Sequence, residues 1–480
     1  MNTFTPSMIM AILPELMLLI LALLVLVMEL VWKNENGRKL GWLTAGGLLL
    51  ILVVSAFLGK PAEASDVFGG MIRYDSLGFI FKMLFVFGAM LTSLFMMDSE
   101  KLGQRGESYI LLLVATIGMS FMASAGDLIM LYLAIETTSI PMYILAGFMR
   151  DDKKSTEAGL KYLLFGAMTS AIMLYGFSLL FGFTGSTDLA VVSGFSMPLA
   201  IGVILLLVVG IGFKISLAPF HFWAPDVYEG APTPISGFLS TASKAAGFAV
   251  IMRLFIGLFP SGEYAQMWTL TLAILASLSM TIGNVVALRQ TNIKRMLAYS
   301  SIAHAGYALV GAVSLSELGV GSVTFYLIAY VMTNLAAFGI VAAFSRITGS
   351  DEISDYAGMS RRSPGLALAM LVAFLSLTGM PPFGGFVAKV FVFAAAVEAG
   401  MIWLAFVGIL NSIVGVYYYL TVLKVVYLHR MEGENEAEHP IPLTRPYAIA
   451  LTVLSAAILL IGVIFGPWFN AASSAALNLF

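Results

Sequence analysis

The chain has 480 residues, of which 60% are hydrophobic and 11% are charged, whereas a soluble domain is about 25% charged. This composition excludes a water-soluble globular protein and predicts an integral membrane protein. The absence of cysteine excludes thiolate-held iron–sulfur clusters, c-type haem and disulfides, and four histidines leave little room for haem or a multi-histidine metal site. A net charge of −2, without a basic patch, gives no indication of nucleic-acid binding.

Apolar runs of about 20 residues, the length that crosses a bilayer, divide the chain into about fourteen predicted helices. The N-terminal run has no positively charged region and carries Glu15, which favours a first spanning helix over a cleaved signal peptide. Connections are short, so we predict one polytopic all-α membrane domain over residues 1–480. The predicted helices span residues 8–32, 39–58, 74–97, 107–124, 127–149, 156–183, 197–220, 231–258, 266–287, 293–313, 318–346, 363–396, 400–428 and 445–468.

Lysine and arginine are concentrated in the loops that follow odd-numbered helices, whereas the other loops carry little beyond Lys60 and Arg73. Basic loops stay on the cytoplasmic side of a membrane. The asymmetry predicts both termini on the outer face, which requires an even number of helices. The basic residues of the predicted inner loops are Lys33, Arg38, Lys39, Lys101, Arg105, Arg150, Lys153, Lys154, Arg289, Lys294, Arg295, Arg346, Arg361, Arg362, Arg430 and Arg445.

Two predicted helices contain a proline break beside a lysine. Helix seven carries Lys214 before the break at residues 218–219. Helix twelve carries Lys389 after the break at residues 381–382, and helix eight holds Lys244 near its centre. Backbone groups freed by a break need protein or water partners because lipid offers none, so we expect locally hydrated cavities beside these lysines.

The sequence of helix six recurs in helix eleven at a constant offset, as with Tyr162 and Tyr326, which are 164 residues apart. The two helices are an odd number apart, so the copies must cross the membrane in opposite senses. Inverted repeats with paired broken helices are typical of transporters with sites near the midplane. We place repeat one at about residues 107–258 and repeat two at about 266–428. The other matches are Leu163, Met168, Thr169, Thr184, Gly185 and Ser186 with Leu327, Met332, Thr333, Thr348, Gly349 and Ser350.

Five ionisable residues lie well inside predicted helices: Glu136, Lys214, Lys244, His304 and Lys389. An ionisable group near the bilayer centre costs roughly 2.5–3.5 kcal/mol, so each needs a reason to be there. Burial favours neutral lysine, and a neighbouring carboxylate restores the charged form. We predict a Glu136–Lys214 pair that holds a proton when closed and releases it when opened. The other three groups would be onward stations for that proton.

Structural interpretations of these groups stay open at the level of sequence. Charge pairs also occur in membrane bundles as packing elements, and His304 could be a hydrogen-bond donor between helices. Lys161, near the inner end of helix six, could take part in proton transfer or extend to the membrane interface. Water and hydroxyls such as those of Ser240, Ser243 and Tyr299 would bridge the stations.

Other charged residues are assigned local roles. We predict that Lys82 and Arg253 extend to the membrane interface as anchors. Asp127 is expected to cap a helix N-terminus. Asp226 and Glu229 lie in an inner loop, where they could orient the turn or contact a partner.

Three segments carry a resemblance to a known family: residues 214–248, 292–311 and 376–393. Over nearly its whole length the chain resembles the subunit N family. Members of this family are antiporter-like membrane subunits of bacterial NADH-quinone oxidoreductase (respiratory complex I). The sequence PDVYEGAPTP (225–234) distinguishes it from the sister subunits L and M. Lys389 stands where subunit M carries glutamate, and the long lateral helix of subunit L does not follow the last helix.

The resemblance implies fourteen helices, with helices four to eight and nine to thirteen as inverted repeats, and a proton channel. The family's glutamate on helix five falls on Glu136. Its lysines on helices seven, eight and twelve fall on Lys214, Lys244 and Lys389, and its helix-six lysine falls on Lys161.

The resemblance also implies a function, namely a proton-translocating membrane-arm subunit that couples quinone reduction in other subunits to proton transfer. It implies no cofactor or redox centre in this chain, with NAD, FMN, iron–sulfur clusters and quinone in partner subunits. Subunit M and the small subunits K and J would be its neighbours in a bacterial cell membrane. The alternatives are a subunit of a multisubunit Na⁺/H⁺ antiporter, which shares the fold and the lysines, and a structural scaffold subunit without its own channel.

Overall fold

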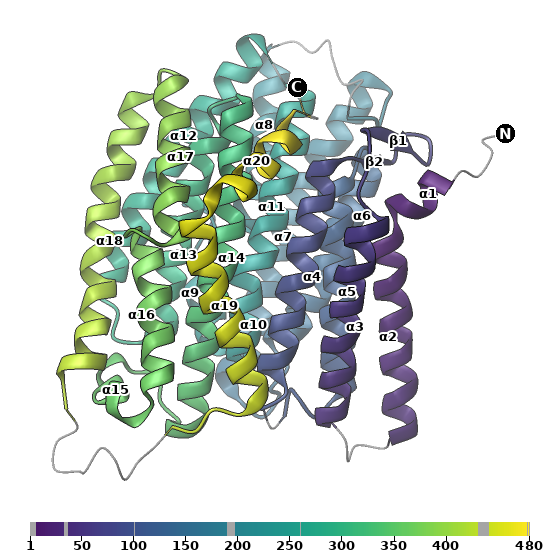
Figure 1. Cartoon of the computed structure of the whole chain (residues 1–480). Coiled ribbons are helices and arrows are strands. Elements are labelled where there is room, and N and C mark those ends of the chain that lie inside the picture. Colours follow the sequence, from purple (N-terminus) through teal and green to yellow (C-terminus); the bar gives the residue numbers. More distant parts are fainter. Residues whose placement is uncertain are drawn as a thin grey trace.

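The computed structural model is a bundle of long helices that lie side by side (Figure 1). It describes residues 6–32, 37–99, 101–189, 197–259, 261–430, 441–477 and 479. The predicted all-α membrane fold class is confirmed. Lys33 and most of the connection between the predicted helices 400–428 and 445–468 lie outside the described residues. The helix α20 and the short helix α1 lie at one end of the bundle, and α15 lies at the other (Figure 1).

The first part of the chain forms a three-helix unit with a small hairpin. The predicted first helix is two helices that meet near Ile12. A two-stranded antiparallel hairpin separates the next two long helices. The elements are α1 (Pro6–Ala11), α2 (Leu13–Trp32), α3 (Gly37–Leu58), β1 (Ser65–Val67), β2 (Ile72–Tyr74) and α4 (Ser76–Met96).

The next elements contain the first break. After α8 the chain turns through the short helix α9 before it crosses again. That crossing is continuous over residues 233–256 because two π-helical turns join α10 to α11 and extend α11. The elements are α5 (Gly106–Ser124), α6 (Leu128–Ala146), α7 (Lys153–Thr184), α8 (Met197–Lys214), α9 (Trp223–Gly230), α10 (Thr233–Phe238), the π-turn Leu239–Ser243, α11 (Lys244–Ile251) and the π-turn Met252–Ile256.

The remaining elements contain the second break, between α16 and α17. They are α12 (Gly262–Ala287), α13 (Ile293–Ala312), α14 (Glu317–Thr348), the 3₁₀ turn Ile353–Tyr356, α15 (Met359–Arg362), α16 (Pro364–Thr378), α17 (Gly384–Glu398), α18 (Ile402–Leu428), α19 (Arg445–Val463) and α20 (Phe465–Ala476).

Each of the fourteen predicted segments corresponds to one described helix or to a pair of helices separated by a break. Eleven described helices are long and apolar enough to cross a membrane. The other three segments are the short apolar helix α8, the helix α13 and the broken pair α16–α17. The break after Thr378 divides the segment 363–396 into α16 and α17, and polar side chains such as Ser300 and His304 interrupt the apolar surface of α13.

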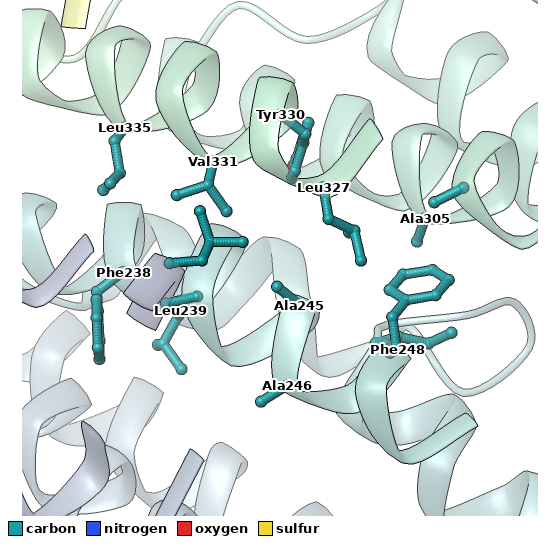
Figure 2. Close-up of a cluster of buried hydrophobic side chains, with 14 of the residues drawn as sticks. Phe238, Leu239, Ala245, Ala246, Phe248, Ala305, Leu327, Tyr330, Val331 and Leu335 are labelled. Atoms are coloured by element: carbon teal, nitrogen blue, oxygen red, sulfur yellow. The ribbon is translucent and has the colours of Figure 1, made fainter. Parts of the chain in front are cut away.

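The centre of the bundle is the contact between α14 and the crossing 233–256, which are almost wholly buried. Figure 2 shows Leu239 and Ala245 of that crossing opposite Leu327 and Val331 of α14. Because α14 belongs to repeat two and this crossing to repeat one, apolar burial joins the two predicted repeats. Large apolar side chains on α2, α3 and α18 are exposed, as expected for surfaces that face lipid or other subunits.

Two matching corners support the internal repeat. In the first corner Leu128 N–H donates to Thr187 O at 2.8 Å, and in the second Ile293 N–H donates to Asp351 O at 2.8 Å. The helix before each corner ends at a glycine with positive φ, 67° at Gly185 and 71° at Gly349.

The first corner contacts the β1–β2 hairpin, at the end of the bundle that holds α20, and the second lies near α15 at the other end (Figure 1). The two corners are therefore inverted with respect to each other. The outer limits of the two repeats, 107–258 and 266–428, stay a prediction.

Candidate functional site

Protein groups hold the backbone at the first break, between α8 and α9. Ala218 N–H donates to Ser279 Oγ at 2.8 Å, and Trp223 Nε1 donates to Phe213 O at 3.2 Å. The irregular backbone is thus tied to α12 and to the end of α8, as it must be where lipid supplies no partner. Lys214 is the last residue of α8, so the break places its ammonium group inside the bundle.

Lys389 is fixed by the second break. Its ammonium group donates to Leu377 O at 3.2 Å and to Thr378 O at 2.9 Å, the carbonyls of the last turn of α16. These carbonyls form the negative end of the helix dipole, which favours a cation. Gly385 permits this arrangement, because a Cβ there would lie 1.9 Å from Ser376 O.

A cavity of about 10 Å³ lies next to Lys389, and His304 and Ser376 contribute to its lining. That volume is near the minimum for one water molecule, which needs roughly 10–15 Å³. The space is large enough for one water at most, and hydrated cavities beside the lysines stay a prediction.

Glu136 and Lys214 do not form the predicted ion pair in this structure. The Glu136 carboxylate instead accepts the hydroxyl of Ser170 on α7, and the Lys214 ammonium donates to Ser139 Oγ at 2.9 Å. Ser139 lies one turn after Glu136 on α6, so it takes the position next to Lys214 that the carboxylate was expected to take. Glu136 and Ser139 lie three residues apart on α6 and so share one face of that helix.

Lys244 is buried at the centre of the bundle. It donates to Ser301 O at 2.9 Å and to Ser301 Oγ, and it lies 5.9 Å from the ring centroid of Tyr228. It follows the π-turn directly. Among the described residues its hydrogen bonds and ring contact are with hydroxyl, carbonyl and aromatic groups, and it forms no salt bridge with an acid.

His304 links Lys244 to Lys389 through tyrosines. Its Nδ1 lies 2.7 Å from Tyr326 Oη, and its Nε2 lies 3.3 Å from Tyr419 Oη, which also contacts Ser300. Ser300 is next to the Ser301 that binds Lys244. On the other side, the ring of Tyr307 lies 4.8 Å below the Lys389 ammonium.

The tyrosines were missed at the level of sequence. Ser240, one of the predicted bridges, instead accepts a hydrogen bond from Asn334. Tyr307 follows His304 by three residues in α13, a spacing that places both on one helix face and could have identified it. Tyr326 and Tyr419 lie on α14 and α18, and no local pattern indicates that they meet α13.

The space between Lys214 and Lys244 also contains polar groups. Ser216 Oγ and Tyr228 Oη are buried there, and neither has a hydrogen-bond partner among the described residues. Buried polar groups of this kind are normally satisfied by ordered water. The half-buried Glu136 and the buried Lys214, Lys244, His304 and Lys389 thus form one polar series, which we call the central series.

Lys161 lies apart from the central series, with 36% of its side chain exposed. It binds Asp226 at 2.6 Å and Glu157 at 2.7 Å. Arg295 on α13 binds Asp226 and Glu229, each at 2.8 Å. Asp226 and Glu229, whose role was left open, therefore tie α7, α9 and α13 together at the end of the bundle that holds α15.

The same cations set the protonation of the two acids. Burial raises the pKa of Asp226, but hydrogen bonds from Lys161 and Arg295 outweigh it, so that the pKa lies below its ordinary value. The pKa of Glu229 is lowered in the same way, with hydrogen bonds from Lys154 and Arg295 outweighing burial. Both acids stay ionised, and the network stays closed, at neutral pH.

The prediction that Lys82 and Arg253 are interfacial anchors is wrong. Lys82 binds Glu15 at 2.8 Å, with 5% and 3% of the two side chains exposed. Arg253 makes a two-pronged contact with the buried carboxylate of Asp75 and donates to Ala123 O at 3.0 Å. Anchoring would leave the charged heads at the surface, whereas here each head has a buried carboxylate partner.

Asp127 does cap α6, accepting hydrogen bonds from the backbone N–H groups of Ile129 and Met130. The prediction of a helix N-cap is confirmed.

Comparison with known proteins gives the class of this architecture. Residues 125–415 match the family described as "NADH:quinone oxidoreductase/Mrp antiporter, TM". The matched region runs from the start of α6 to α18 and contains the whole central series. The fold is that of the antiporter-like membrane proteins.

Relatives define the family more narrowly. NADH-quinone oxidoreductase subunit N of Moorella thermoacetica is 44% identical over 474 residues, covering 97% of this chain and 98% of that protein. One chain of respiratory complex I from Thermus thermophilus is 33% identical, with a TM-score of 0.81 and coverage of 95% of this chain and 98% of that chain. A chain of the Mrp complex from Dietzia has a TM-score of 0.86 over 99% of this chain and 98% of that chain, but at 20% identity it shows the fold alone. The chain belongs to the subunit N family of NADH-quinone oxidoreductase.

Proposed function

We propose that the chain translocates protons as a membrane-arm subunit of an NADH-quinone oxidoreductase, coupling quinone reduction elsewhere in the complex to proton transfer. The observation that carries this proposal is the central series, which runs through both repeats from Glu136 to Lys389. Buried ionisable groups in a membrane protein mark proton or ion pathways by default.

The geometry supports a division of roles along the series. Glu136 is its only acid and lies beside Lys214, so a small shift of α6 against α8 changes the field at that ammonium. Lys244 is the central station, because it lies between the two breaks and contacts α13. His304, with Tyr326 and Tyr419 on its two nitrogens, can pass a proton from one nitrogen to the other. Lys389 is the terminal station. Lys161 belongs to the ion-pair network of Asp226, Glu229 and Arg295 at α9, and we assign it as a positioning residue.

Partners supply the redox chemistry in this proposal. The chain has no cysteine with which to hold an iron–sulfur cluster, so NAD, FMN, iron–sulfur clusters and quinone are assigned to other subunits. Subunits M, K and J are the proposed neighbours.

The native assembly tests this function. We expect purification through this chain to yield a quinone reductase, and we expect the reconstituted assembly to acidify vesicles on NADH addition in sodium-free buffer. Sodium-dependent transport by an assembly without quinone reductase would contradict the proposal and favour a Na⁺/H⁺ antiporter subunit. The Mrp likeness gives that alternative no support beyond the fold.

We also propose an orientation in a bacterial cell membrane, with α1 and α20 on the outer face. The charge asymmetry of the loops supports it. Because the chain has no cysteine, Lys60→Cys and Lys153→Cys each add a single thiol to this subunit at an exposed position. An impermeant maleimide should label Lys60→Cys in intact spheroplasts and Lys153→Cys in inverted vesicles. The opposite pattern would contradict the orientation.

A further inference from the structure

A cavity of about 1150 Å³ lies at the end of the bundle opposite α20, far from the central series. It is enclosed by the first residues of α3 and α10, the last turns of α4 and α14, and the start of α19. Figure 1 shows the starts of α3 and α19 at this end, on either side of α4. A drug-sized ligand occupies roughly 300–1,000 Å³, so the cavity has room for a large polar group.

Basic side chains dominate the described lining. Arg38, Lys39, Lys101 and Arg346 line the cavity, and Asp98 is the one acid that the described lining contains. The Asp98 side chain is 0% exposed and binds Arg38 at 2.8 Å and Arg346 at 3.2 Å. Lys101 is paired with Asp151 at 2.9 Å, but one carboxylate cannot neutralise the two guanidinium groups and Lys39, so the lining keeps an excess of positive charge.

Donors remain available to a ligand. Arg38 is 66% exposed although one of its nitrogens binds Asp98, and Lys39 has no acidic partner among the described residues. Arg346 lies over the ring of Tyr447 at 5.6 Å, which fixes its guanidinium at the cavity wall. A planar guanidinium beside an ammonium group is an arrangement that binds phosphate.

The surface next to the cavity is apolar. Trp42 follows Arg38 by one helical turn and is 45% exposed, and Leu49, two turns further along α3, is also exposed. Residues at these spacings share one helix face. A ligand with a charged head in the cavity and apolar chains along α3 would match both surfaces, whereas free phosphate would leave the apolar face unused.

We propose that this cavity binds the phosphate head group of an anionic phospholipid in the inner leaflet. Basic pockets between transmembrane helices on the cytoplasmic side are suited to such head groups. The bound lipid would join the unit α2–α4 to α14 and α19. The leaflet follows from the proposed orientation, but the site does not depend on proton transfer by the central series.

Photo-crosslinking to the intact complex tests the proposal. A photoactivatable phosphatidylglycerol should crosslink to the α3 segment of the wild-type subunit. With about 1 kcal/mol per basic residue, Arg38→Gln/Lys39→Gln should raise the half-saturating lipid fraction about thirtyfold. Arg38→Lys/Lys39→Arg keeps both charges and should restore crosslinking. Arg289→Gln/Arg430→Gln, which removes two exposed charges that do not line the cavity at the same end of the bundle, should not change it.

Several results would overturn the proposal. One is equal crosslinking in the Arg38→Gln/Lys39→Gln variant, and another is equal crosslinking by photoactivatable phosphatidylcholine in the wild-type complex. Competition by inorganic phosphate alone would identify a free-anion site instead. A protein interface would be identified instead if the wild-type complex does not crosslink and the Arg38→Gln/Lys39→Gln complex loses a neighbouring subunit. The phosphatidylcholine comparison needs no variant, so it decides even if the variant does not assemble.

Discussion

Replacing Lys244 with methionine is expected to reduce quinone-linked proton pumping by roughly a hundredfold or more. Without Lys244, a proton must cross the bundle centre with no ionisable group to receive it, and an unassisted charge there costs roughly 2.5–3.5 kcal/mol. Methionine keeps most of the side-chain volume, so packing against Tyr228 and Ser301 should survive. The measurement is vesicle acidification by the reconstituted complex on NADH addition.

The control for Lys244→Met is Lys153→Met, which removes an exposed lysine from the same subunit and should pump normally. Subunit composition of the purified variant separates a lost proton step from lost assembly. Normal pumping by an assembled Lys244→Met complex would show that the central station is dispensable.

Asp75→Asn is expected to cause the largest loss of stability. Removing one partner of a buried ion pair costs about 3–5 kcal/mol, because the other charge is left unpaired. Asparagine can still accept the N-cap hydrogen bond that Asp75 accepts from Gly78 N–H. The loss of stability therefore measures mainly the broken ion pair with Arg253. The thermal midpoint of the solubilised complex and the amount of assembled complex in the membrane should both fall.

A second variant makes the Asp75 result specific. Asp75→Leu combined with Arg253→Met removes both charges and should recover much of the lost stability. Lys153→Gln removes an exposed charge elsewhere in the subunit and should leave the thermal midpoint unchanged. An unchanged midpoint in Asp75→Asn would show that the buried pair does not hold the hairpin region to the central crossing.

The course of the chain was predictable because membrane helices are encoded locally. A run of apolar residues has to be a helix in lipid, and a proline in that run marks a candidate break, although Pro141 lies inside the continuous helix α6. The breaks beside Lys214 and Lys389 and the Tyr162–Tyr326 repeat therefore follow from sequence order alone. The split of the first predicted helix near Ile12 was missed, although Pro14, at the start of α2, is a signal that could have indicated it.

The pairing of side chains was not predictable, because it depends on how each helix is rotated against its neighbours. Glu136 was expected to face Lys214, but Ser139 takes that place. Arg253 and Asp75 are 178 residues apart, and nothing near either residue indicates the other. Arg253, whose charge is buried, was therefore predicted to be an anchor at the membrane interface.

The central claim is that the buried groups act in series, and the most direct test compares one substitution with four. The rate of NADH-driven vesicle acidification should be measured for Lys244→Met and for a complex that also carries Glu136→Gln, Lys214→Met and Lys389→Met. Steps in series fail together, so the two rates should be equally low. Acidification at the wild-type rate by the assembled fourfold variant would contradict the claim and would leave the chain a structural scaffold.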